Sequence, residues 1–145
     1  MKRAKELIPL SREHNRALLL ARRARRAAHS QDPDRIREAW RELLEVYRDE
    51  MADHFRTEES LLFPIARELG HHSLVDRLLR EHAAIRQTLA ESHRQTPERL
   101  KTLGEVLTQH VRREERELFP ILETQLDDHR RNALAAALDE ADSAP

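Results

Sequence analysis

The sequence contains no cysteine, and this absence limits the chemistry open to the protein. Disulfides, iron-sulfur clusters, cysteine-ligated zinc and thiol nucleophiles are all excluded. Any bound metal must therefore be held by nitrogen and oxygen. No apolar run approaches the roughly 20 residues that a membrane-spanning helix needs, and charged residues interrupt the first apolar stretch before it reaches the length of an export signal. These features favour a cytoplasmic protein without a membrane partner.

Residues that favour strands and tight turns are also scarce. The chain has two glycines, three phenylalanines, one tyrosine and one tryptophan among its 145 residues. Helix-forming residues, chiefly alanine, leucine, arginine and glutamate, dominate instead. With 39% hydrophobic residues, the chain has the size of one domain with one core. We therefore expect an all-α fold formed by a single domain over residues 1–145.

Charged residues make up 37% of the chain, but acids and bases almost cancel and the net charge is −1. So small a net charge produces no field that would attract nucleic acid. A basic cluster, Arg22, Arg23, Arg25 and Arg26, falls on the polar faces of the expected first helix, and we interpret it as a solvated surface. The sequence thus predicts no nucleic-acid partner.

The most informative feature is an internal repeat. The tripeptide Arg-Glu-His at residues 12–14 recurs at residues 80–82. The segment from His54 to Ile65 aligns without a gap with the segment from His110 to Ile121, and both contain His-x-x-x-Glu-Glu and end in Leu-Phe-Pro-Ile. Each half of the chain therefore pairs an Arg-Glu-His segment with a His-x-x-x-Glu-Glu segment, and the halves look related by duplication.

Helix-capping residues divide the chain into four principal helices. Ser11 can cap a first helix that runs to about residue 28, and the Asp-Pro pair at 32–33 can start the second. Ser73 can cap a third helix that runs to about residue 94, and the Thr-Pro pair at 96–97 can start the fourth. Short connections favour antiparallel neighbours. We therefore expect an antiparallel up-down-up-down four-helix bundle with a short C-terminal helical tail over about residues 128–139.

Pro64 and Pro120 occupy matching places in the repeat. Because proline lacks a backbone donor and clashes with the preceding turn, each is expected to end or bend its helix. The repeated Leu-Phe-Pro-Ile can act as a hydrophobic helix terminator. Phe63 and Phe119 within it can also seal a site against water.

Helical spacing places His14, His54, His82 and His110 on apolar stripes that would face a core. A lone histidine on such a stripe is usually a core or boundary residue, and a lone His-x-x-x-Glu in so charged a chain is usually a surface pair. The matching contexts in both halves of the chain make a shared site the better interpretation.

Only one glutamate of each Glu-Glu pair shares the face of its histidine. Glu58 and Glu114 fall about 40° around the helix from the histidines four residues before them, whereas Glu59 and Glu115 fall about 140° away. The inward carboxylates are therefore Glu58 and Glu114. The other two can accept a hydrogen bond from a ligand histidine or form surface salt bridges with Arg56, Arg112 or Arg113.

Six ionisable groups buried without basic partners would destabilise a small bundle. Burying an unpaired charge costs several kcal/mol, against a total stability of about 5–15 kcal/mol. A pair of divalent cations resolves the conflict, because imidazole and carboxylate suit iron, manganese or zinc. If both glutamates bridge, each metal receives two histidines and two oxygens, and octahedral iron keeps positions open for a small ligand. The candidate metal ligands are His14, His54, Glu58, His82, His110 and Glu114.

Together these motifs resemble those of the hemerythrin-like, or HHE cation-binding, domains. The resemblance covers about residues 7 to 125 and rests on the first-helix histidine, the Glu-His of the third helix and the doubled His-x-x-x-Glu-Glu with Leu-Phe-Pro. It implies that the six candidates bind a non-haem di-iron centre with bridging carboxylates. The expected cofactor is two iron ions joined by an oxo (Fe-O-Fe) or hydroxo bridge, with zinc or manganese as alternatives.

One departure from the oxygen-carrying hemerythrins bears on function. Those proteins are similar but have a fifth histidine one turn from the third-helix ligand. Here the positions four residues either side of His82 are Leu78 and Arg86. The other histidines near the third helix are interpreted as surface residues. The resemblance therefore implies the more open four-histidine, two-carboxylate site and argues against simple oxygen transport.

Three functions are compatible with such a site. The first is a di-iron module that binds or senses a small ligand such as O2 or NO, or responds to redox state. The second is an enzyme that consumes peroxide or reduces nitric oxide, so the sequence leaves catalysis open. The third is a metal-storage or structural bundle. A four-helix bundle can also form homo-oligomers through exposed leucine or alanine patches, and the sequence does not fix this state.

Overall fold

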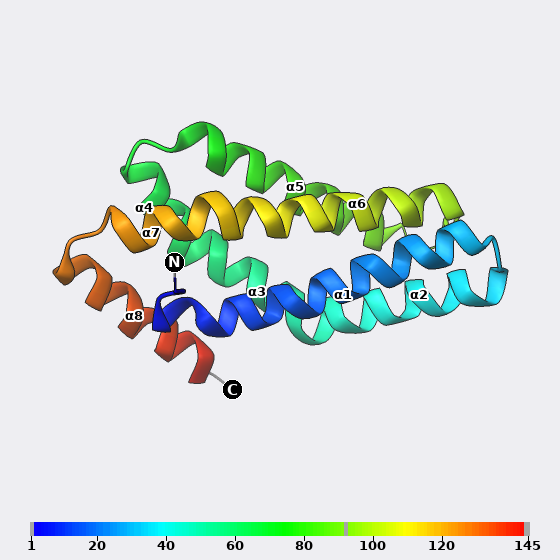
Figure 1. Cartoon of the computed structure of the whole chain (residues 1–145), viewed down its shortest axis with the longest axis horizontal. Helices are drawn as coiled ribbons and strands as arrows, with labels where there is room; N and C mark the ends of the chain where they lie inside the picture. Colours follow the sequence, from blue (N-terminus) through cyan, green and yellow to red (C-terminus); the bar gives the residue numbers. More distant parts are fainter. Residues whose placement is uncertain (1, 92, 144–145) are drawn as a thin grey trace.

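The computed structural model describes residues 2–91 and 93–143, and all regular structure within them is helical. Five helical rods make up the fold (Figure 1). The first is α1, Ile8–Ser30, and the second runs through α2 (Pro33–Val46), α3 (Ala52–Thr57) and α4 (Phe63–Glu68). The third is α5, His72–Ala90. The fourth joins α6, Pro97–Arg113, to α7, Phe119–Thr124, and the last is α8, Asp128–Ser143.

The first four rods pack antiparallel, with α1 between α2 and α6, and α5 against α6 (Figure 1). The predicted all-α, up-down-up-down bundle with a C-terminal helix is confirmed. The C-terminal helix α8 is longer than expected. It packs across one end of the bundle, against the 3₁₀ turn Lys5–Leu7 (η1) and the second rod. Within the described residues, no helix is long and apolar enough to cross a membrane.

Two of the predicted helix caps are present. The Asp32 side chain accepts a hydrogen bond from the backbone N–H of Asp34 at 2.9 Å, and Thr96 accepts one from the N–H of Arg99 at 3.2 Å. A proline occupies the first turn after each cap, where its missing donor costs nothing. These caps fix where α2 and α6 begin.

The other two predicted caps are wrong. Helix α1 begins three residues before Ser11, with Pro9 in its first turn, and α5 begins one residue before Ser73. The Ser11 hydroxyl is used elsewhere, because it donates to Glu115 Oε2 at 2.7 Å. The two serines therefore indicated roughly where α1 and α5 begin, but neither serine is the capping residue.

Neither repeated proline ends its helix. Instead, π-helical turns precede them, Glu58–Leu62 (η3) before Pro64 and Glu114–Leu118 (η4) before Pro120, and the helices then continue. Each wide turn starts at a glutamate that was predicted to face the core. Such turns occur frequently at functional sites, because they shift the following side chains around the helix axis.

The apolar core consists of two clusters. One, which includes Trp40 and Leu107, fills the half of the bundle that contains α2, and the other, which includes Phe63 and Phe119, fills the half covered by α8. The candidate ligands lie on each rod where the two clusters meet. The polar layer is therefore enclosed by hydrophobic packing on both sides.

Small residues let α1 and α6 approach closely. A Cβ atom added at Gly104 would lie 2.9 Å from the backbone oxygen of Ala21 and 2.8 Å from Arg25 Cγ. The basic cluster at residues 22, 23, 25 and 26 is exposed, as predicted, and so are His72 and His93. Helix α1 thus buries its alanine face and leaves its arginines in solvent.

Candidate metal centre

All six predicted ligands lie in one buried layer across the bundle. None exposes more than 4% of its surface, and Glu58, His82 and Glu114 expose none. The four histidines come from the four rods of the bundle, and each glutamate follows a histidine by one helical turn, at the start of a π-helical turn. The structure therefore brings together every residue that the repeat singled out.

The six side chains form two overlapping sets of four. The first set contains both glutamates with His14 and His54, and the second contains both glutamates with His82 and His110. Within each set, one potential ligand atom from every residue lies within 4.8 Å of the others. Because Glu58 and Glu114 belong to both sets, they lie where carboxylates that bridge two cations would lie.

The unsatisfied atoms of this layer fit a cation pair. The Oε2 atoms of Glu58 and Glu114 are buried and have no hydrogen-bond partner among the described residues. The Nε2 atoms of the two histidines in each set lie 3.1 Å apart. One Nε2 atom can donate to the other only where the second carries no proton, whereas two imidazoles directed at one cation adopt the same arrangement with both nitrogens unprotonated. Four nitrogens and two carboxylates are a donor set suited to iron, manganese or zinc.

Protons compensate the charges of the metal-free layer. Burial alone would lower the pKa of His54, but the Glu58 charge and the hydrogen bond with Glu13 outweigh it and raise the pKa to about 9. Burial is likewise outweighed at His110, where Glu114 raises the pKa to about 10. Burial would raise the pKa of Glu58, but positively charged His54 helps to lower it well below its usual range. Cations and protons therefore compete for the same ligands.

A further carboxylate orients each histidine through its Nδ1 atom. Glu115 Oε2 lies 2.6 Å from His14 Nδ1, and Glu59 Oε2 lies 2.7 Å from His82 Nδ1. Both glutamates therefore accept from a histidine, and each also pairs with an arginine, although not with Arg56, Arg112 or Arg113. Each of these contacts joins one half of the repeat to the other. They fix the ring orientation and leave Nε2 directed at the centre of the layer.

The remaining two orienting carboxylates were missed in the sequence. Glu13 lies 2.9 Å from His54 Nδ1, and Glu81 lies 3.0 Å from His110 Nδ1. These glutamates are the middle residues of the two Arg-Glu-His tripeptides. The repetition of this tripeptide was the signal available in the sequence. It did not indicate that each glutamate contacts a ligand histidine on another helix and not the histidine next to it in the chain.

Arginines hold three of the four orienting carboxylates from outside. Arg86 forms a two-pronged ion pair with Glu59, at 2.7 and 3.0 Å. Arg3 lies 3.2 Å from Glu115, and Arg113 lies 3.3 Å from Glu81. Burial by itself would raise the pKa values of these glutamates, but hydrogen bonds from their histidines and neighbouring side chains lower all three. Arg86 occupies one of the two positions where a fifth histidine was looked for, and it holds the carboxylate of Glu59 that orients the ligand His82.

Aromatic rings cover the histidines. Phe119 stacks on His14 with ring centroids 5.3 Å apart, and Phe63 lies 5.3 Å from His82, both consistent with a role in excluding water. The closest ring is Phe55, which stacks on His82 at 3.8 Å and 13°. Its counterpart in the repeat is Val111, so the comparison of the two halves gave no signal for it.

A small cavity adjoins the ligands. Its volume is about 10 Å³, and it touches His14, His54 and His110. Apart from these histidines and Glu13, its wall is apolar and includes Met51, Leu107 and Val111. A space of this size is close to the minimum that holds one water-sized molecule.

The fold and the site define a helical bundle with a buried histidine and carboxylate layer suited to metal ions. Comparison with protein families gives a match to the hemerythrin HHE cation binding domain over residues 9–122. The chain therefore belongs to the hemerythrin HHE family. Searches of curated proteins and of solved structures found no match. Helix α8 lies beyond the matched residues.

Proposed function

We propose that the protein binds two iron ions in the buried layer and uses them to bind or sense a small diatomic molecule such as dioxygen. The observation that carries this proposal is the pair of ligand sets that share Glu58 and Glu114. Each set offers two imidazoles and two carboxylates, which leaves an octahedral ion with positions free for a small ligand. Bound iron would supply redox activity that no side chain in the layer possesses.

The surroundings favour binding over turnover. Among the residues that the structure describes, Glu13 is the only ionisable one besides the ligand histidines that lines the small cavity, and its carboxylate is held by His54. General acid-base catalysis needs a group free to transfer a proton to the substrate, and the wall of this cavity supplies none. Its apolar residues suit an uncharged ligand of about the size of water.

The chain's own side chains would keep this ligand away from bulk water. Phe55, Phe63 and Phe119 are at most 2% exposed and lie against the ligand histidines. The four orienting carboxylates hold the Nε2 atoms toward the layer. A dry and rigid environment of this kind favours reversible binding over side reactions with solvent.

The test is spectroscopic. Protein loaded anaerobically with Fe²⁺ should contain two iron ions per chain, and its visible absorption should change on exposure to oxygen and return when oxygen is removed. A His110→Ala variant should lose both properties, whereas His72→Ala, which removes an exposed histidine, should retain them.

Other outcomes would replace the proposal. Catalytic loss of peroxide or nitric oxide that disappears in His110→Ala would indicate an enzyme at the same centre. Protein purified with zinc or manganese alone, and without an oxygen-dependent spectrum, would indicate a structural or storage role.

A further inference from the structure

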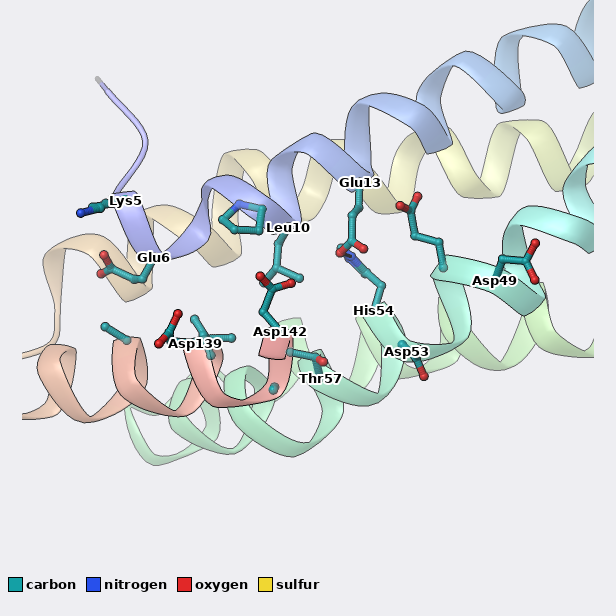
Figure 2. Close-up of a pocket in the computed structure, with 15 residues that line it drawn as sticks. Lys5, Glu6, Leu10, Glu13, Asp49, Asp53, His54, Thr57, Asp139 and Asp142 are labelled. Atoms are coloured by element: carbon teal, nitrogen blue, oxygen red, sulfur yellow. Dashed lines mark hydrogen bonds and ion pairs between the residues drawn. The ribbon is translucent and has the colours of Figure 1, made fainter. Parts of the chain in front are cut away.

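A large acidic pocket lies outside the metal layer, between α1, the second rod and α8. Its volume is about 640 Å³, and Figure 2 shows the residues that line it. Seven of them are acidic, and two, Lys5 and His54, are basic. The acidic residues are Glu6, Glu13, Asp49, Glu50, Asp53, Asp139 and Asp142.

The pocket ends at the metal layer. His54 and Glu13 form part of its wall, and Figure 2 shows the Glu13 carboxylate reaching from α1 to the imidazole of His54. The same two residues also line the small cavity that touches His14 and His110. The Glu13 and His54 pair is therefore the partition between an open acidic pocket and the interior of the site.

Glu13 differs from the other three orienting carboxylates. Glu59, Glu81 and Glu115 each form an ion pair with an arginine, whereas Glu13 has none with lysine or arginine in the described part of the chain. Its counterpart in the repeat, Glu81, is held by Arg113. The two halves of the site are thus inequivalent, and the side next to His54 lacks the arginine that covers the others.

Helix α8 adds charge at this side. Asp139 and Asp142 line the pocket opposite Glu6 of η1 and Leu10 of α1 (Figure 2). Within residues 2–91 and 93–143, neither aspartate forms an ion pair with lysine or arginine. The other pocket acids Glu6, Asp49, Glu50 and Asp53 are each paired with an arginine. Helix α8 lies outside the residues matched by the family model, so this wall of the pocket is not part of the matched region.

We propose that this pocket is the route by which divalent cations reach the metal layer, with Asp139 and Asp142 attracting the ion and Glu13 and His54 admitting it. A cleft lined by one sign of charge raises the local concentration of counter-ions and their association rate. The ion would reach the set formed by His14 and His54 first. The proposal rests on the two-cation site described above and assigns a function to α8.

The test measures metal uptake by metal-free, full-length protein in stopped flow, with Co²⁺ as the probe and its visible absorption as the signal. The variant is Asp139→Asn/Asp142→Asn, which removes two charges from the pocket and no ligand. The control is Asp128→Asn/Glu140→Gln, which removes the same charge from exposed positions of α8 outside the pocket. At low ionic strength the pocket variant should take up Co²⁺ roughly three- to tenfold more slowly than wild type, and the control at the wild-type rate.

Two further measurements distinguish an effect on the entry route from an effect on the metal site. The difference between variant and wild type should disappear at about 0.5 M salt, because screening removes electrostatic attraction, and final metal content should be equal in all three proteins. Equal uptake rates at low salt, or equal slowing in the control, would overturn the proposed route while leaving the site intact. Failure of wild type to take up any metal would overturn both.

Discussion

Glu58→Gln replaces one buried carboxylate that both ligand sets share, and its effect on the metal-free protein follows from the pKa of His54. Glu58 Oε2 lies 3.2 Å from His54 Nε2 and, together with the hydrogen bond of Glu13, outweighs burial and raises the pKa of His54 to about 9, against an ordinary value of 6.5. A group whose pKa is raised by folding adds stability that is complete below pH 6.5 and is lost as pH rises through about 9. At pH 7 this contribution is about 3 kcal/mol.

Because Glu13 still holds His54 in the variant, we expect metal-free Glu58→Gln to lose up to about 3 kcal/mol of unfolding free energy at pH 7 and much less at pH 10. Chemical denaturation of chelator-treated protein at the two pH values measures this difference. Glu105→Gln, which changes an exposed glutamate of α6, is the matched control and should leave stability unchanged. An equal loss at both pH values would refute the electrostatic reasoning, because a packing defect does not depend on the charge of His54.

The same variant should respond differently to metal. Wild type should gain about 4 kcal/mol when free metal exceeds its Kd a thousandfold, whereas Glu58→Gln should gain little because both sets lose a ligand. Metal analysis after gel filtration should then find two ions per chain in wild type and in Glu105→Gln. Full metal content in Glu58→Gln would refute the role of this residue as a bridging ligand.

Three other perturbations give separate predictions. Glu81→Gln should weaken metal binding by about 10- to 100-fold without unfolding the protein, because His110 loses the carboxylate that orients its ring. Chelator competition measures the affinity, and an unchanged value would contradict the orienting role of Glu81. Gly104→Ala should lower the unfolding free energy by about 1–3 kcal/mol, because the added Cβ would lie 2.9 Å from the Ala21 backbone oxygen. Denaturant titration measures this loss, and a stabilised variant would contradict the prediction by showing that α1 can move away. Metal binding at pH 7 should release about three protons, from His14, His54 and His110, because the neighbouring glutamates raise the pKa of His14 well above its ordinary value and those of His54 and His110 to about 9 and 10. An indicator dye in weak buffer detects them, and binding without proton release would count against direct ligation.

The sequence predicted the helical bundle because helix-forming composition, paired caps and apolar periodicity all agree. The six residues of the layer could also be found from one sequence, because the same motifs occur in both halves of the chain. His54 and His110 each precede an inward glutamate by four residues, and this interval fixes which glutamate shares the face of the histidine. Local periodicity was therefore sufficient to identify the side chains that face the buried layer.

Contacts between helices were harder to predict. Glu13 and Glu81 orient histidines on other rods, and the distance along the chain from Glu13 to His54 carries no information about this contact. The prolines were expected to end or bend their helices, but π-helical turns accommodate them. The acidic pocket is assembled from three separate segments, so no single segment indicated it.

The most direct test of the central claim is a crystal structure of the iron-loaded protein with anomalous diffraction measured at the iron edge. We expect two peaks in the buried layer, about 3.5–4 Å apart as in other two-metal sites. One should lie beside His14 and His54 and the other beside His82 and His110, with Glu58 and Glu114 between them. A single peak, or iron bound only at exposed residues, would contradict the account.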